Sequence, residues 1–133
     1  MKLVIDTNRI IASLIKDSYS RSIIYNRKFA FFTPQFATEE IYKYKKYILD
    51  KSGMNEKAFE DLIMLIFQKI IIVSKENYSL FIKQAEKIIS DMKDAPFIAL
   101  CLALDTEGVW SDDKHFLAQK KVRVFTTKDL LEQ

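Results

Sequence analysis

Acidic residues stand at the ends of short apolar segments in widely separated parts of the 133-residue chain. Asp6 ends the run "LVID", and Asp94 opens the segment "DAPFIALCLAL". Asp112 and Asp113 follow "GVWS". Carboxylates that a fold brings within several Å repel one another and raise each other's pKa, unless a cation lies between them. Because oxygen ligands favour a hard ion, the pattern indicates a site for Mg²⁺ or Mn²⁺.

Each acid, taken singly, also has a structural explanation. Asp94 precedes a proline by two residues at a helix start, where an N-cap aspartate is favoured without any function. Asp112 or Asp113 can cap the short helix that follows in the same way. Glu39 and Glu40, in "TPQFATEEI", can simply be solvated. Only a cation site explains why a fold would bring several of these acids together.

Other catalytic chemistries lack their residues. No CxxC, HExxH or paired-histidine spacing is present, and His115, the single histidine, is interpreted as a surface residue beside an acidic loop. Cys101, the single cysteine, lies in the apolar run "FIALCLAL" and cannot form an internal disulfide, which favours a reducing cytoplasm. No Ser–His–Asp or Cys–His arrangement suggests a side-chain nucleophile.

Composition and charge exclude further classes of protein. A net charge of +3 permits a polyanionic partner without demanding one. No apolar stretch approaches the roughly 20 residues needed to span a bilayer. Asp6, Asn8 and Arg9 interrupt the N-terminal apolar run too early for a signal peptide. We therefore expect a soluble, cytoplasmic protein with no membrane partner.

Lysines and tyrosines alternate in the segment "YKYKKYILDK". A basic, aromatic segment of this kind can hold phosphates and stack nucleic-acid bases. It can equally be the wet face of a helix whose aromatic residues turn inward. The lysines concerned are Lys43, Lys45 and Lys46, and the tyrosines are Tyr42, Tyr44 and Tyr47.

Short apolar runs alternate with segments of helical periodicity. The runs predicted to form strands are residues 2–6, 29–33, 70–73, 108–111 and 122–126. The predicted helices are residues 9–17, 20–27, 34–50, 55–68, 75–90, 94–104, 112–119 and 128–133. Thr33 is predicted to cap the helix that starts at Pro34.

Strands that alternate with helices and are apolar on both faces indicate a parallel sheet covered by helices on both sides. We predict a single domain over residues 1–133, of the α/β class, with three α/β/α layers and a central parallel sheet of about five strands. Ligands of such folds gather at the carboxyl ends of the strands. The acids can therefore converge on one edge of the sheet.

Four segments, taken in order, resemble the motifs of PIN-domain ribonucleases, a family that includes the VapC-type toxins of prokaryotic toxin–antitoxin pairs. The segments are "LVIDTN", "TPQFATEEI", "DAPFIALCLAL" and "VWSDDKHF". "VRVFTTKDLL" is similar to the last strand and helical turn of such domains, so the resemblance covers nearly the whole chain. It implies a PIN-like α/β/α domain.

The resemblance also implies roles for individual residues. The implied catalytic and metal-binding residues are Asp6, Glu40, Asp94 and Asp113. Glu40 is favoured over Glu39 because the family's glutamate usually precedes an aliphatic residue. Asn8 and Ser111 are implied as supporting residues, Asn8 by helping to orient Asp6. Asp112 stands where the "S/T-x-D" motif often has Gly or Asn, so it is an additional candidate ligand, and the choice between Asp112 and Asp113 stays open.

The implied function is that of an endoribonuclease that uses Mg²⁺ or Mn²⁺ and acts as the toxin of a VapBC-type toxin–antitoxin pair. Bound ions would lower the pKa of a water molecule and aim it at a phosphodiester phosphorus. The expected partners are an RNA substrate, a separately encoded antitoxin and a second copy of the chain in a homodimer. On this interpretation, Lys43, Lys45 and Lys46 become candidates for contact with the RNA backbone.

Two other classes of function stay open. A catalytically silent PIN-like domain would bind RNA or a partner protein as a scaffold, although a scaffold has no reason to keep mutually repelling acids. An α/β phosphotransfer or phosphatase domain would use Asp6 as its nucleophile. Enzymes of the haloacid dehalogenase type, however, have a second aspartate two residues on, where this chain has Asn8.

Overall fold

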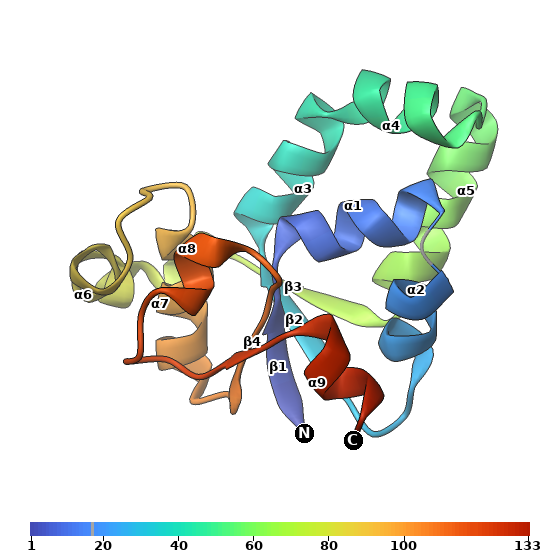
Figure 1. Ribbon diagram of the computed structural model, residues 1–133. Helices are drawn as coiled ribbons and strands as arrows, with labels where there is room; N and C mark the ends of the chain where they lie inside the picture. Colours follow the sequence, from blue (N-terminus) through green and yellow to red (C-terminus); the bar gives the residue numbers. More distant parts are fainter. Residues whose placement is uncertain (17) are drawn as a thin grey trace.

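The computed structural model describes residues 1–16 and 18–133, and within these it contains a five-stranded parallel sheet flanked by helices (Figure 1). The strands are β1 (Lys2–Ile5), β2 (Ala30–Pro34), β3 (Ile70–Val73), β4 (Gly108–Trp110) and β5 (Val124–Phe125). Their order in the sheet is β3-β2-β1-β4-β5, and each pairing is parallel. The predicted α/β class and parallel sheet are confirmed.

Helices lie on both sides of the sheet. They are α1 (Thr7–Ile15), α2 (Ser18–Tyr25), α3 (Gln35–Lys43), α4 (Lys45–Ser52), α5 (Glu56–Phe67), α6 (Ile82–Ile88), α7 (Ala95–Leu104), α8 (Lys114–Leu117) and α9 (Thr127–Leu131). Two short 3-10 turns, η1 (Lys75–Asn77) and η2 (Ser79–Phe81), precede α6. In Figure 1, α6, α7 and α8 lie to the left of the sheet, and α1, α2, α5 and α9 lie to its right. This is the expected three-layer arrangement.

The central strand and the edge strand differ in burial. Leu3, Val4 and Ile5 of β1 are fully buried, as expected for a strand covered on both faces. In β3, at the edge of the sheet, Ile71 and Ile72 are 57% and 44% exposed. Coverage by helices therefore ends before this strand, although its sequence is as apolar as that of β1.

The start of α3 differs from the prediction. Thr33 is not an N-cap, because β2 continues through Thr33 to Pro34 and the helix begins at Gln35. The Thr33 hydroxyl is buried and donates to the backbone oxygen of Ile5 in β1 at 3.0 Å. A buried hydroxyl needs a partner, and the neighbouring strand supplies one that a local sequence pattern does not show.

Two predicted helices are each divided. The segment 34–50 forms α3 and α4, separated at Tyr44, whose ψ of 14° is not helical. The segment 75–90 forms η1, η2 and α6, because Tyr78 leaves the helical conformation with φ −131° and ψ 0° and packs into the core at 3% exposure. Burial of one large side chain has here outweighed helical periodicity.

The remaining differences are shifts of boundaries. Helix α1 begins at Thr7 instead of residue 9, and Asp17, the last residue of the helix predicted over 9–17, lies outside the described residues. Helix α5 agrees with its prediction, and Asn55 caps it by accepting from the N–H of Ala58 at 2.8 Å. Within the described residues, no helix is both long and apolar enough to cross a membrane.

Candidate active site

Asp6 follows β1 directly and precedes α1. Its backbone N–H donates to the oxygen of Trp110 in β4 at 3.1 Å, and its side chain is buried, since the residue is only 4% exposed. The carboxylate accepts from the Ser111 hydroxyl at 2.8 Å and from the backbone N–H of Asn8. Ser111 therefore contacts Asp6 through its side chain, whereas Asn8 contacts it through the backbone N–H, which does not depend on the asparagine side chain.

Ser111 connects the ends of β1 and β4. Its fully buried hydroxyl donates to Asp6 and accepts from the backbone N–H of Asp113 at 3.0 Å. A hydroxyl has one donor and two acceptor positions, so Ser111 satisfies a carboxylate and an N–H with one atom. It therefore fixes the start of the Asp113 loop relative to Asp6.

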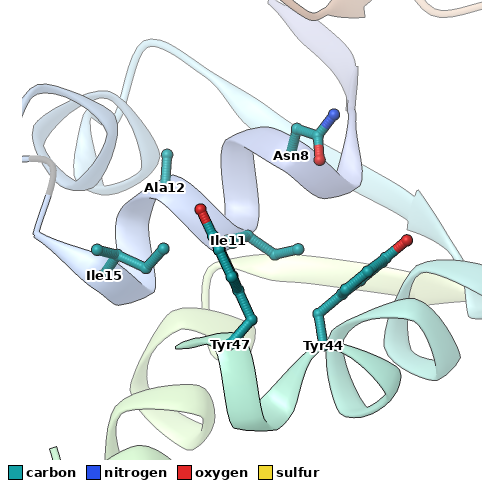
Figure 2. A pocket seen from close by; sticks show the side chains of 6 residues that line it. All are labelled: Asn8, Ile11, Ala12, Ile15, Tyr44 and Tyr47. Carbon is teal, nitrogen blue, oxygen red and sulfur yellow. The ribbon is translucent and has the colours of Figure 1, made fainter. Parts of the chain in front are cut away.

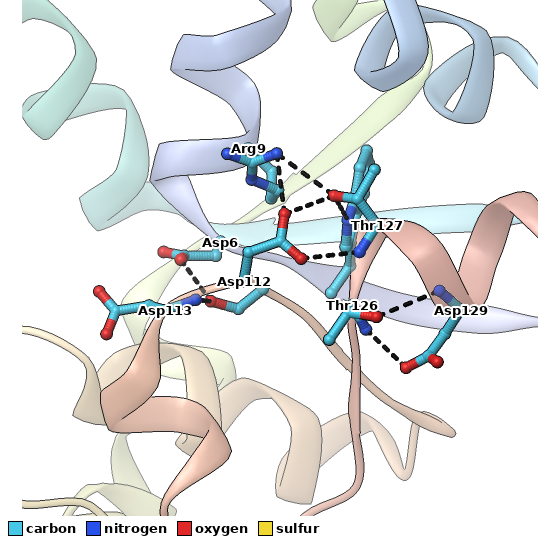
Figure 3. Close-up of polar contacts among 9 residues, drawn as sticks. Asp6, Arg9, Asp112, Asp113, Thr126, Thr127 and Asp129 are labelled. Carbon is cyan, nitrogen blue, oxygen red and sulfur yellow. Dashed lines mark hydrogen bonds and ion pairs between the residues drawn. The ribbon is translucent and has the colours of Figure 1, made fainter.

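Asp112 and Asp113 point in different directions (Figure 3). Asp112 accepts from the backbone N–H of Thr127 at 2.8 Å and pairs with Nη1 of Arg9 at 3.0 Å, which ties the end of β4 to α9 and α1. Asp113 caps α8, because its Oδ1 accepts from the N–H of His115 at 2.8 Å. The capping explanation therefore holds for Asp113, and Asp112 has a structural partner of its own.

Asp94 precedes the first residue of α7. Its side chain accepts no capping hydrogen bond, so the explanation of Asp94 as a conventional N-cap is wrong. Its Oδ2 atom is buried and has no hydrogen-bond partner among the described residues. An unpaired buried carboxylate oxygen is costly, and it is the atom in this region that a bound cation would satisfy.

Glu40 on α3 lies close enough to Asp6 for its negative charge to raise the Asp6 pKa. It accepts a hydrogen bond from the Thr7 hydroxyl on α1 at 2.7 Å. Burial raises the pKa of Glu40, and this hydrogen bond and neighbouring lysines oppose the shift. Glu39, in contrast, is exposed and lines a different pocket, together with Tyr78.

Two residues that the sequence did not point to lie beside Asp94. Asp91, Asp94 and His115 each offer one possible ligand atom, and these atoms lie within 4.8 Å of one another. His115 was expected at the surface and is exposed, but its Nδ1 lies 3.2 Å from Oδ1 of Asp113. A turn closed by the Asp94 N–H and the Asp91 oxygen (3.0 Å) brings Asp91 here, so an acid three residues before Asp94 was the available signal.

Burial and mutual repulsion raise the pKa values of these acids. Burial raises the pKa of Asp6 to about 6; the Ser111 hydrogen bond opposes this shift and the charge of Asp113 adds to it. Burial raises the pKa of Asp94 to about 7, and the charge of Asp6 is the next largest cause. A divalent cation would relieve both causes, since it replaces lost hydration and screens the repulsion. The residues present therefore fit a hard metal ion.

The three lysines considered for RNA contact face different surroundings. Lys45 Nζ lies 3.8 Å from Glu56 and 3.9 Å from Glu60, both on α5. Lys43 and Lys46 are exposed. The bend between α3 and α4 thus turns Lys45 toward α5 and leaves the other two at the surface.

A comparison with the curated proteins found no match. The family model for the PIN domain matches residues 4–131, which is almost the full length of the chain. PIN domains are generally nucleases, a kind of hydrolase, and typically use divalent metal ions. Together with the parallel α/β fold and the acidic site at its sheet edge, this match shows that the chain belongs to the PIN-domain family.

Proposed function

We propose that the chain is a Mg²⁺- or Mn²⁺-dependent endoribonuclease that hydrolyses RNA phosphodiester bonds. The observation that carries this proposal is the buried Oδ2 atom of Asp94, which lacks a hydrogen-bond partner among the described residues while Asp6 and Asp113 place negative charge near it. Such an arrangement destabilises a fold unless a cation binds there. Membership of a nuclease family supports the same conclusion.

Each proposed site residue has a distinct task. The proposed ligands of one or two metal ions are Asp6, Glu40, Asp94 and Asp113, and Asp91 and His115 are further candidates from the geometry. Ser111 and Asn8 orient Asp6, and Thr7 orients Glu40. When bound, a divalent ion supplies a Lewis acid that activates water and neutralises charge on the leaving oxygen. Asp112 takes part indirectly, through its contacts with Arg9 and Thr127.

The biological setting is a second part of the proposal. We propose that the nuclease is the toxin of a VapBC-type pair, that it acts in the cytoplasm, and that a separately encoded antitoxin and a second copy of the chain bind it. The support is the ordered resemblance of its four motifs to VapC-type toxins, together with exposed apolar residues at the β3 edge, such as Ile71.

Replacement of two neighbouring glutamates tests the nuclease. Glu40→Gln should reduce Mn²⁺-dependent cleavage of a fluorescent RNA by about 100-fold or more, because it removes charge from the site. Glu39→Gln, one residue away but exposed, is the matched control and should cleave like the wild type. EDTA should abolish cleavage, and added Mn²⁺ should restore it.

The alternative classes give other outcomes in the same experiment. A catalytically silent scaffold would bind RNA but would not cleave it, whichever metal ion is added. A phosphatase that uses Asp6 as a nucleophile would hydrolyse small phosphate esters and form a phosphorylated Asp6. RNA cleavage that is unaffected by EDTA, or by Glu40→Gln, would contradict the proposed mechanism.

A further inference from the structure

A groove with a volume of about 410 Å³ lies between α1 and α4. Four residues of α1 at helical spacing form one wall, and two tyrosines form the other (Figure 2). The lining residues are Asn8, Ile11, Ala12, Ile15, Tyr44 and Tyr47. We call this feature the Tyr44–Tyr47 groove.

The two tyrosines differ from their neighbour Tyr42. The Tyr42 ring packs edge-on against Phe59 with a centroid distance of 6.0 Å, and its hydroxyl donates to Glu60 at 3.0 Å. Tyr44 and Tyr47 are 41% and 52% exposed, and Figure 2 shows their rings projecting toward α1. The groove therefore presents two accessible aromatic faces.

A lysine ammonium group lies over each of these two rings. Lys43 Nζ lies 5.9 Å from the centre of the Tyr44 ring, and Lys51 Nζ lies 5.9 Å from the centre of the Tyr47 ring. Both lysines are exposed. Aromatic faces beside surface cations are the combination that binds single-stranded nucleic acids, because bases stack on the rings and phosphates pair with the cations. A purely apolar segment of a protein would leave both lysines without a charged partner.

Asn8 connects the groove with the acidic site. The backbone N–H of Asn8 donates to the Asp6 carboxylate, while the side chain of Asn8 lines the groove. On the opposite wall, Glu40 lies four residues before Tyr44. A strand whose backbone passes the acids at the sheet edge can therefore place its adjacent bases between α1 and α4.

We propose that the Tyr44–Tyr47 groove binds unpaired bases next to the phosphodiester that is cut, with Tyr44 and Tyr47 as the residues that recognise these bases. The identity of the occupant rests on the proposed ribonuclease function. Tyr44 and Tyr47 provide the stacking surfaces, and the Asn8 amide provides a hydrogen-bonding group for a base edge. Bases paired inside a helix cannot enter such a groove, so double-stranded RNA should bind poorly.

Fluorescence anisotropy in EDTA, where no cleavage is expected, tests this inference. The probes are a labelled single-stranded RNA of about ten nucleotides and an abasic version with the same number of phosphates. Tyr44→Leu and Tyr47→Leu should each raise the Kd for the RNA by about 10-fold, while Tyr44→Phe and Tyr47→Phe should keep the wild-type Kd. The abasic probe should bind weakly and should not distinguish these variants.

Tyr25→Leu is the matched control. Tyr25 on α2 is 42% exposed and has Lys69 Nζ 5.8 Å from its ring centre, but it does not line the groove. This variant should bind RNA like the wild type. The slope of log Kd against log salt should stay unchanged in the Leu variants of Tyr44 and Tyr47, because their phosphate contacts remain.

The inference would be overturned if the two probes bound equally well, or if both Leu variants kept the wild-type Kd. Either result is expected if a partner protein, and not RNA, fills the groove. These outcomes are separable from failure of the nuclease proposal. If the wild type cleaves RNA and the Leu variants bind RNA with the wild-type Kd, only the groove proposal is contradicted. If the wild type binds the bases of the RNA but never cleaves the RNA, only the nuclease proposal is contradicted.

Discussion

Three aspartates of the site differ in their hydrogen-bond and ion-pair partners, and therefore in the roles they can have. Asp112 is neutralised by Arg9 and accepts from Thr127, so its charge is already used within the fold. Asp113 caps α8 with one oxygen. Asp94 has a buried oxygen that lacks a partner among the described residues. Of the three, Asp94 is therefore the residue whose replacement best separates function from stability.

Asp94→Asn should abolish RNA cleavage and leave the fold intact. Asparagine has nearly the same shape, and it removes a negative charge that the charges of Asp6 and Asp113 disfavour. In EDTA the variant should be at least as stable as the wild type in urea unfolding. With Mn²⁺, it should gain less stability than the wild type, because the cation loses a ligand.

Asp105→Asn is the control for this substitution. Asp105 lies at the other end of α7, is exposed and has a left-handed backbone with φ 52°, which asparagine tolerates. This variant should cleave RNA at the wild-type rate. A folded Asp94→Asn protein with wild-type activity would show that Asp94 has no catalytic task.

At the scale of elements, β4 depends on Gly108. A Cβ atom at this position would lie 2.9 Å from the ring of Phe125 in β5 and would meet the backbone of Arg123, the residue before β5. The backbone N–H of Val109 donates to that same Arg123 oxygen at 3.0 Å. The close approach of β4 and β5 therefore requires a residue without a side chain.

Gly108→Ala should lower the free energy of unfolding by about 1–3 kcal/mol, the usual cost of overpacking. Gly53, the only other glycine of the sequence, is the control. Gly53 has φ +75° but open space around it, so Gly53→Ala should cost roughly 1 kcal/mol from backbone strain alone. Urea unfolding measures both, and a smaller loss for Gly108→Ala than for Gly53→Ala would contradict the packing argument.

Helices α3 and α4 divide the basic segment into two surfaces. Lys45 faces the acids of α5, and Lys43 and Lys46 face solvent. Replacing Lys43 and Lys46 with glutamine should weaken RNA binding and reduce the slope of log K against log salt by roughly 1.4, about 0.7 for each lost phosphate contact.

Lys45→Gln is the matched control for the double variant. It should leave the salt slope unchanged and reduce stability by less than about 1 kcal/mol, because its ion pairs with α5 are long and partly exposed. If Lys45→Gln changed the salt slope as much as the double variant does, Lys45 would have to turn away from α5 when RNA binds.

At the scale of the whole molecule, the acidic site couples folding to pH and to metal ions. The pKa values of Asp6 and Asp94 are raised from 3.8 to about 6 and about 7. Between the unfolded and folded pKa values, the folded chain binds more protons than the unfolded chain. These two groups therefore make the free energy of unfolding fall as the pH rises from about 4 to about 7. Below this range their contribution is fully present.

Metal ions should reverse this dependence. Bound cations require deprotonated carboxylates, so the increase in melting temperature produced by Mn²⁺ should grow from pH 5 to pH 7.5. Thermal unfolding in EDTA and in Mn²⁺ at both pH values measures the effect, and Asp94→Asn should show a smaller pH dependence than the wild type in EDTA. An equal Mn²⁺ effect at the two pH values would contradict the coupling.

The class of fold and the separate acidic segments could be predicted from the amino-acid pattern. Apolar runs of strand length alternate with helical periodicity, and this local pattern dictates which residues must be buried. Parallel strands then bring their carboxyl ends to one edge, which places Asp6 beside the Ser111–Asp113 loop. The order of motifs was enough to indicate the PIN-domain family that the family match shows.

The directions of individual side chains could not be predicted in this way, because their partners come from elements distant in the sequence. Arg9 of α1 and Thr127 of α9 direct Asp112 away from Asp113. Ile5 of β1 supplies the acceptor that keeps Thr33 in a strand instead of at a helix cap. Local periodicity determines burial of a segment, whereas the direction of a polar side chain depends on the nearest charge or hydrogen-bond partner, which exists only after the chain has folded.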